Sequence, residues 1–304
     1  MINKKRNFVR IINEICVEEN IALDSLSYDW IFRLSKENKA NFIMGYQFGL
    51  NLAVSNEICC DKSAASEMME LSGIPNIKHE LFMSMKKQKY IGTISIWNDL
   101  IDRLNKYGKL VCKPNNGTGG DEVYLVTNQA ELENATNIIF THSDAMAVSP
   151  YVEITDEYRC VVLDGEIELI YKKKRPSIIG DGISTVNEII LKSGHTKVTS
   201  VSANKVLANG EEYFLSWKHN LGLGASSEIV LVESCNSMII DLAKQVSLKL
   251  NIRFASIDIV LVGNEYKVLE VNSGVMLEFF SRESEENYQI AKCIYRDAIV
   301  KMLE

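Results

Sequence analysis

The chain has 304 residues, of which 46% are apolar and 24% charged, as in an ordinary soluble globular protein with room for two packed domains. Its net charge of −7 argues against sequence-independent binding to nucleic acid. No apolar run reaches the roughly 18 residues of a membrane span, and no signal-peptide core follows the basic residues 1–6. The seven scattered cysteines include no Cys-x-x-Cys pair, which favours reduced thiols in a cytoplasm over disulfides or a zinc site.

The first third of the chain is predicted to be helix-rich. Residues 1–60 are expected to be mostly helical, with short extended pieces such as 28–32. A helix is predicted over 61–72, because Asp61 is a plausible N-cap and a Gly-Ile-Pro sequence at 73–75 would end it.

The rest of the chain mixes strands and helices. From 90 to 150 the pattern predicts strand, helix, strand, turn, strand, helix and strand, and Asn128 with Glu131 forms a capping-box-like helix start. The remainder is strand-rich apart from helices predicted over 237–250 and about 285–303. Helices alternating with strands and hairpins indicate an α+β class.

The strongest local pattern is a β-hairpin over 254–272, in which two apolar, β-branched runs flank a Gly-Asn turn. Glu270 and Asn272 lie two residues apart and therefore share a face of their strand. Asp258 lies nearly opposite Glu270 in most plausible registers. Hard oxygen ligands in this arrangement suit Mg²⁺, which usually also holds substrate phosphates. The alternative is three polar residues on a solvated sheet face.

A glycine-rich loop between two short strands is the second strong signal. Lys113 ends the first strand, and Gly117, Gly119 and Gly120 follow it. Glycines let backbone N–H groups wrap phosphate oxygens without Cβ clashes. The strand–loop–strand order differs from the strand–loop–helix of a P-loop or a dinucleotide fold. Lys62 could supply a second ammonium group, or it is an ordinary surface lysine.

Three further segments could complete a nucleotide site. Residues 149–162 read as a strand, a polar connection that could meet an adenine edge, and a second strand carrying Glu157 and Arg159. Glu157 could accept hydrogen bonds from ribose; the alternative for these two residues is a surface ion pair of little energy. Arg175 follows a run of lysines and is suited to bidentate binding of carboxylates or phosphates. Asn220 begins a flexible glycine-containing loop.

In this order, the motifs resemble those of the ATP-grasp superfamily. The resemblance covers roughly residues 60–304 and is closest to the cyanophycin-synthetase and glutathione-synthetase branch. Two features point to that branch: Arg175-Pro followed by Gly180-Asp-Gly182 and Thr185-x-x-Glu188, and the Asn220-Leu-Gly-Leu-Gly224 loop. The motifs are Asp61-Lys62, Lys113-Pro with its glycine loop, Glu157-Tyr-Arg159, Asn220-Leu-Gly, and Asp258 with Glu270-Val-Asn272.

The resemblance implies an ATP-grasp fold with two α+β subdomains that clasp ATP. Residues 61–150 would form the small subdomain with its glycine-rich lid, residues 151–304 the large subdomain with the metal site, and residues 1–60 a short, mainly helical N-terminal region. The implied nucleotide-binding residues are Lys62, Lys113, Gly117, Thr118, Gly119, Gly120, Tyr151, Val152, Glu153 and Glu157. Asp258, Glu270 and Asn272 would bind Mg²⁺, or Mn²⁺ in its place. Arg159, Arg175 and Asn220 would hold the transferring phosphoryl group and the acyl intermediate.

The activity implied by the resemblance is an ADP-forming carboxylate–amine ligation through an acyl phosphate, with an amino acid or small peptide as substrate. A phosphotransferase and a non-catalytic nucleotide-binding module are the rival functions. Relatives have a longer N-terminal domain that helps to bind substrate, which leaves open that a second subunit of a homo-oligomer completes the pocket. His219, beside Asn220, is expected to have no chemical role.

Overall fold

The computed structural model describes residues 6–91, 96–117, 119–193 and 204–304. Its centre is a five-stranded antiparallel sheet, the large sheet, with the strand order β13 (Ser226–Ile229), β10 (Glu166–Lys174), β9 (Ile154–Leu163), β14 (Phe254–Val262) and β15 (Glu265–Asn272). The hairpin predicted over 254–272 is confirmed, and its register places Asp258 opposite Glu270.

Both faces of the large sheet are buried. On one face, Val162, Ile170 and Ile257 pack against α8 (Ser237–Lys249). On the other, Val161 and Tyr171 share a core with α1 (Asn7–Glu18) and α9 (Glu285–Leu303). Residues alternate between the two cores along each strand, because successive side chains of a strand point to opposite faces. The helices predicted at 237–250 and 285–303 are thereby confirmed.

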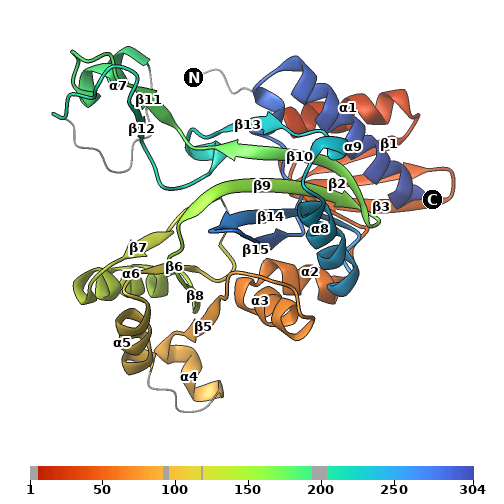
Figure 1. The fold of residues 1–304 in the computed structure, drawn as a ribbon. Helices are drawn as coiled ribbons and strands as arrows, with labels where there is room; N and C mark the ends of the chain where they lie inside the picture. The colour runs from red at the N-terminus through yellow and green to blue at the C-terminus, as the bar shows by residue number, and fades with distance from the viewer. Residues whose placement is uncertain (1–5, 92–95, 118, 194–203) are drawn as a thin grey trace.

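The prediction of a mainly helical N-terminal region is wrong. Between α1 and α2 (Ala53–Cys60) the chain forms an antiparallel sheet of β1 (Ala22–Leu26), β2 (Ile31–Lys36), β3 (Lys39–Met44) and β4 (Gln47–Phe48). Phe32, Leu34 and Ile43 alternate with exposed residues and enter the core shared by α1 and α9. This period of two belongs to a half-buried strand and is incompatible with an amphipathic helix. The N-terminal region is thus built onto the large sheet (Figure 1).

A second, small sheet has the order β5 (Glu80–Met83), β8 (Ala145–Pro150), β6 (Leu110–Pro114) and β7 (Tyr124–Val126). Helices α5 (Ile96–Tyr107) and α6 (Gln129–His142) pack on it, and Asn128 caps α6 as predicted, accepting a hydrogen bond from the Glu131 N–H. The expected order of elements holds, with two differences: the first strand lies before residue 90, and helix α4 (Met85–Ile91) follows it.

Helix α3 (Lys62–Leu71) connects these parts. Asp61 caps it as predicted, accepting a hydrogen bond from the Ala64 N–H, and Ala65 and Met69 join the core between α8 and the large sheet. The chain crosses from the small sheet to the large sheet through residues 151–153, which belong to neither. A separate projection holds α7 (Val186–Ser193) and the pair β11 (Ser177–Ile179) and β12 (Glu212–Phe214) (Figure 1). Among the described residues, no helix is both long and apolar enough to cross a membrane.

Candidate active site between the two sheets

A cavity of about 590 Å³ is lined by residues of both sheets and of the N-terminal region. Every predicted site residue lines this cavity except Thr118, which lies outside the described residues. Its walls come from the end of β6 and the glycine loop, from the connection at 151–153, from one face of the large sheet, and from the loops after β12 and β15. Segments far apart in the sequence thus meet at one concave surface, the usual setting of a ligand site.

Two lysines from different elements approach Glu270 on β15. Lys113 reaches it from β6, with its Nζ 3.5 Å from Oε2, and Lys62 reaches it from the start of α3, with its Nζ 3.8 Å from Oε1. Lys62 also donates to the carbonyls of Asn115 and Gly117 in the glycine-loop segment. Burial lowers the pKa of Lys113, and the adjacent Glu270 only partly opposes this shift. These contacts exclude the interpretation of Lys62 as a solvated surface lysine.

A buried ionic cluster lies on the neighbouring strands. Arg159 donates two hydrogen bonds to the Asp258 carboxylate, at 2.8 and 2.7 Å. Lys173 of β10 lies 2.9 Å from Asp258 and 2.5 Å from Glu157. Burial raises the pKa of Glu157, whereas Arg159 and Lys173 together overcome the burial of Asp258 and hold its pKa below the usual value. A surface ion pair is therefore excluded for Glu157 and Arg159.

The oxygen ligands proposed for a metal lie on the strands β14 and β15 of the large sheet. Glu270 and Asn272 lie on one strand, and Asp258 lies opposite Glu270. The Asn272 Nδ2 is buried without a hydrogen-bond partner in the described structure, as is the Oγ of Ser256, its neighbour in register. No group of three or more His, Cys, Asp or Glu side chains arranged to hold a metal occurs among the described residues. The donor set of two carboxylates and one amide still suits Mg²⁺. In this structure, Lys62 and Arg159 pair with the two carboxylates, Glu270 and Asp258.

The glycine loop meets a loop of the large-sheet side. Asn220, just before the short 3₁₀ helix Leu221–Leu223, donates from Nδ2 to the Gly119 carbonyl at 2.7 Å, and Lys218 donates to the Gly120 carbonyl at 3.3 Å. Gly120 has a φ of +76°, and a Cβ there would lie 2.5 Å from the Asn220 Nδ2. Only glycine permits this approach without displacing the amide. The contact joins two segments that line the cavity.

Arg175 also lines the cavity, and it contacts an aromatic side chain. Its guanidinium stacks over the Phe214 ring, 3.8 Å from the ring centroid. A planar cation held in this way keeps its N–H edge available for an anion.

At the other end, residues 151–153 leave backbone groups outside both sheets. The Tyr151 ring packs edge-on against Trp217, with centroids 5.9 Å apart. Val111, Ile77 and Leu269 also line the cavity and give an apolar slot beside the 151–153 backbone, of which the Tyr151 N–H donates to the Lys109 carbonyl at 3.0 Å. Such a slot suits a flat heterocycle that hydrogen-bonds through its edge.

Three contributions to the cavity were not among the predicted site residues. Lys173 was hidden in the lysine run at 172–175, which reads as a solvated face, although the two-residue period of β10 turns Lys173 inward and Lys174 outward. His219 is buried with its Nδ1 3.5 Å from Glu157, and burial, with Arg175 and Lys173, lowers its pKa to about 4. The turn at 44–47, after β3, supplies a wall from the N-terminal region.

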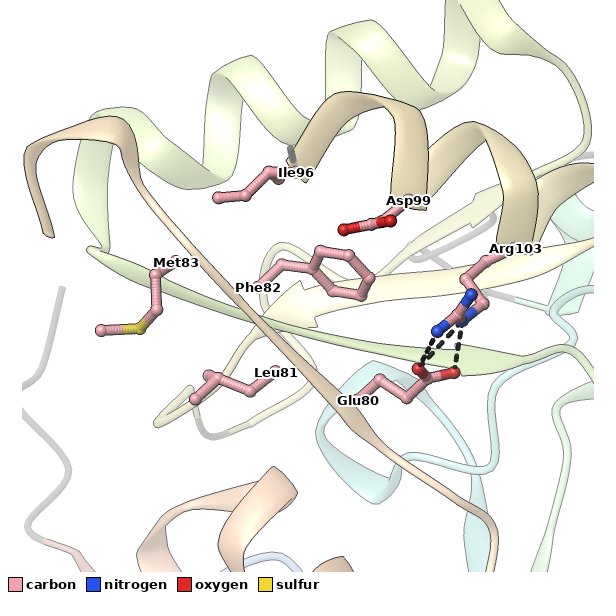
Figure 2. Close-up of a pocket in the computed structure, with 7 residues that line it drawn as sticks. All are labelled: Glu80, Leu81, Phe82, Met83, Ile96, Asp99 and Arg103. Carbon is pink, nitrogen blue, oxygen red and sulfur yellow. Dashed lines mark hydrogen bonds and ion pairs between the residues drawn. The ribbon is translucent and has the colours of Figure 1, made fainter. Parts of the chain in front are cut away.

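A second, smaller cavity of about 270 Å³ lies between β5 and α5. Figure 2 shows its side chains, among which Arg103 and Glu80 form an ion pair with N···O distances of 2.8 to 2.9 Å. None of the predicted site residues lines it. The candidate chemistry is therefore confined to the cavity between the sheets.

Comparison with solved structures identifies the architecture. A bifunctional glutathione synthetase from Pasteurella multocida superimposes with a TM-score of 0.56 over 95% of this chain and 44% of its own, at 14% identity. D-alanine–D-alanine ligase from Bacillus anthracis gives 0.53 over 84% of this chain and 68% of its own, at 17% identity. The chain has the ATP-grasp fold.

Two curated proteins are similar in sequence to parts of this chain. A cyanophycin synthetase from Synechocystis is 25% identical over 251 residues, 73% of this chain and 27% of that protein. A bifunctional glutathione biosynthesis protein from Streptococcus agalactiae is 30% identical over 102 residues, 31% of this chain and 14% of that protein. The matched regions are thus about a quarter or less of these relatives' lengths. No family model matches the sequence.

Proposed function

We propose that this protein is an ADP-forming carboxylate–amine ligase that makes an amide bond through an acyl phosphate. The substrates are small molecules, an amino acid or a small peptide, and the setting is cytoplasmic. Residues 61–150 and 151–304 act as the two subdomains that enclose ATP, and residues 1–60 complete the substrate end of the site.

One observation supports the proposal most strongly: the cavity brings cations from both subdomains against carboxylates of the large sheet, Glu270 on β15 and Asp258 on β14. Lys62 and Lys113 enter from α3 and β6, and Arg159 and Lys173 enter from the large sheet. In the protein alone these cations pair with Glu270 and Asp258. A bound triphosphate would pair with these lysines and the arginine in place of the carboxylates. The carboxylates, Glu270 and Asp258, would then be able to bind a divalent cation. Alternating positive and acidic groups therefore fit a metal-bound polyanion better than either component separately.

Different residues serve nucleotide binding and the first half-reaction, the phosphoryl transfer. Lys62, Lys113 and the glycine loop hold the phosphates, and the slot at 151–153 with Glu157 holds the nucleoside. A substrate carboxylate oxygen attacks the γ-phosphorus, its bond to the β,γ-bridging oxygen breaks, and ADP leaves. Arg159 and Arg175 neutralise the charge that gathers between these anions, since attack of an anion on a polyanion is otherwise strongly disfavoured.

The second half-reaction makes the amide. A neutral amine attacks the carbonyl carbon of the acyl phosphate, and phosphate departs with the electrons of the C–O bond while the nitrogen loses a proton. Asn220 and Lys218 hold the glycine loop over the cavity, which excludes water from a mixed anhydride that hydrolyses readily. Mg²⁺ bound by Glu270, Asn272 and Asp258 would supply Lewis-acid stabilisation of phosphate charge.

Amine-dependent release of ADP tests the proposal. Pairs of amino acids and dipeptides are incubated with ATP and magnesium, ADP is measured, and products are weighed by mass spectrometry. We expect ADP and phosphate only when both a carboxylate and an amine are present, with a product lighter than the summed substrates by one water. Release of ADP without an amine would identify a kinase, and nucleotide binding without ADP formation would identify a non-catalytic module.

Two variants link the activity to the site. Glu270→Gln and Lys113→Met should each lower ADP formation by at least about a hundredfold, because the first removes a proposed Mg²⁺ ligand and the second removes a cation that would neutralise phosphate charge. Lys78→Met is the matched control, since Lys78 forms an exposed ion pair with Glu70 outside the cavity. Equal activity of all three variants would refute the assignment of the site.

A further inference from the structure

The end of the cavity formed by the turn after β3 and the loop after β15 has a composition of its own. Its walls are the turn after β3, with Tyr46, and the loop after β15, with Met276 and Phe279. The Val275 N–H donates to the Tyr46 carbonyl at 3.1 Å, which joins this turn to the loop that directly follows Asn272. The Phe279 ring lies against Gly222 in the Asn220 loop, where a Cβ would lie 3.1 Å from the ring. This end therefore adjoins the groups that would handle the phosphoryl transfer.

Large apolar side chains are exposed at this end. Trp30 is 45% exposed, Met44 56% and Phe279 39%, and all three line the cavity. The Trp30 indole lies against the backbone of Gly45, where a Cβ would lie 2.9 Å from Cζ2. Exposed apolar groups gathered at a concave surface lose solvent contact when a ligand covers them, which marks a binding site.

The polar groups of the same end are already paired with one another. Gln47 donates from Nε2 to the Cys60 Sγ at 3.3 Å, and the Cys60 Sγ lies 3.3 Å from the Ser273 Oγ. The four carboxylates that line the cavity lie elsewhere: Glu153 in the connection, and Glu157, Asp258 and Glu270 in the large sheet, each of these three bound to a cation. Among the described lining residues, no carboxylate belongs to the walls around Met44 and Phe279 to pair with a basic side chain.

We infer that one of the two substrates carries a large uncharged apolar side chain, such as that of leucine, methionine or phenylalanine, which is buried among Trp30, Met44 and Phe279. This inference rests on the proposed ligase function and specifies its substrate class. A basic side chain in this place would lose its hydration without gaining a carboxylate partner from the lining residues, and it would face the Arg6 guanidinium, which lies over the Trp30 ring, 5.6 Å from its centroid. A small side chain would leave the three apolar groups exposed to water.

The test is a specificity measurement with a matched pair of variants. In the assay of ADP release, one substrate is varied among leucine, methionine, phenylalanine, aspartate, lysine and glycine, free or in dipeptides, and kcat and KM are determined. We expect kcat/KM for the best apolar side chain to exceed that for lysine or glycine by at least about tenfold. Met44→Asp should remove this preference mainly through KM. Met238→Asp should leave it unchanged, because Met238 is 53% exposed on α8 and outside the cavity.

The possible outcomes distinguish failure of this inference from failure of the ligase proposal. ADP release that favours charged or small side chains, or a preference that Met44→Asp leaves intact, overturns the inference and leaves the ligase proposal standing. Trp30→Ala provides a second variant with the same expected loss of preference. If no substrate pair gives ADP release although an ATP analogue still binds, both the inference and the ligase proposal are overturned.

Discussion

Replacing Lys173 by methionine should destabilise the protein strongly and in a pH-dependent manner. The Lys173 side chain is only 6% exposed and is shared by two buried carboxylates, 2.5 Å from Glu157 and 2.9 Å from Asp258. Asp258 would keep its two hydrogen bonds from Arg159. Glu157 would keep His219 at 3.5 Å and the electrostatic influence of Arg159, which is already bonded to Asp258. The pKa of His219, about 4, leaves that imidazole uncharged at neutral pH.

Removing one partner of a buried ion pair costs about 3–5 kcal/mol, because the other charge stays buried without compensation. Since Lys173 lines an open cavity that water can enter, we expect the lower end of that range, about 3 kcal/mol at pH 7.5. Lys174→Met is the control: Lys174 pairs with Glu228 and both side chains are about half exposed, so the loss should be under about 1 kcal/mol.

The pH dependence follows from Glu157. Burial already raises its pKa in the folded protein, and loss of Lys173 raises it further. Between the unfolded and folded pKa values of Glu157, the folded variant holds a proton that the unfolded chain has released, so stability falls as pH rises through that interval. The penalty of Lys173→Met should therefore be largest at neutral pH and shrink toward pH 5. Urea unfolding of both variants at pH 7.5 and 5 measures it. A loss no larger than that of Lys174→Met, or one that is the same at both pH values, would refute the reasoning.

Three further outcomes follow from single residues. Gly120→Ala should lower ADP formation, because its Cβ would lie 2.5 Å from the Asn220 Nδ2 and would displace that amide from the Gly119 carbonyl. Gly108→Ala, at a similar φ of +72° with nothing within 4 Å, should cost only about 1 kcal/mol of stability and spare activity; equal activities of the two variants would contradict this. The His219 ring should titrate near pH 4 by NMR, and its contribution to stability, complete above pH 6.5, should be lost as pH falls toward 4; a midpoint near 6.5 would contradict its burial. Asp61→Ala should lower the unfolding free energy by about 1 kcal/mol through loss of the cap on α3, and Asp61→Asn should restore most of it; equal losses would argue against the cap.

The predictable parts of the fold were those with local signals. The hairpin carrying Asp258 and Glu270 has a Gly-Asn turn between β-branched runs, and the helix starts at Asp61 and Asn128 have capping side chains, so short-range chemistry determines them. The N-terminal sheet was missed because β2 and β3 offer few inward residues, such as Phe32 and Ile43, and their pairing depends on the core formed with α1 and α9.

The candidate site divides in the same way. Residues within recognisable motifs, such as Lys113 and Asn220, were predicted, and they line the cavity. Lys173 was not, because a run of lysines looks solvated until the register of β10 against β9 places Lys173 beside Glu157. The wall at Trp30 and Met44 was also missed, since only the tertiary fold brings the turn after β3 to the loop after β15.

Binding of an ATP analogue is the most direct test of the central claim that one cavity unites the phosphate-binding cations and the acidic edge of the large sheet. Isothermal titration calorimetry with a non-hydrolysable ATP analogue at millimolar magnesium should give one saturable site per chain. Lys113→Met should weaken this binding by at least about tenfold, while Lys78→Met should not change it. Folded protein that takes up no adenine nucleotide, or that binds it equally well in both variants, would contradict the account.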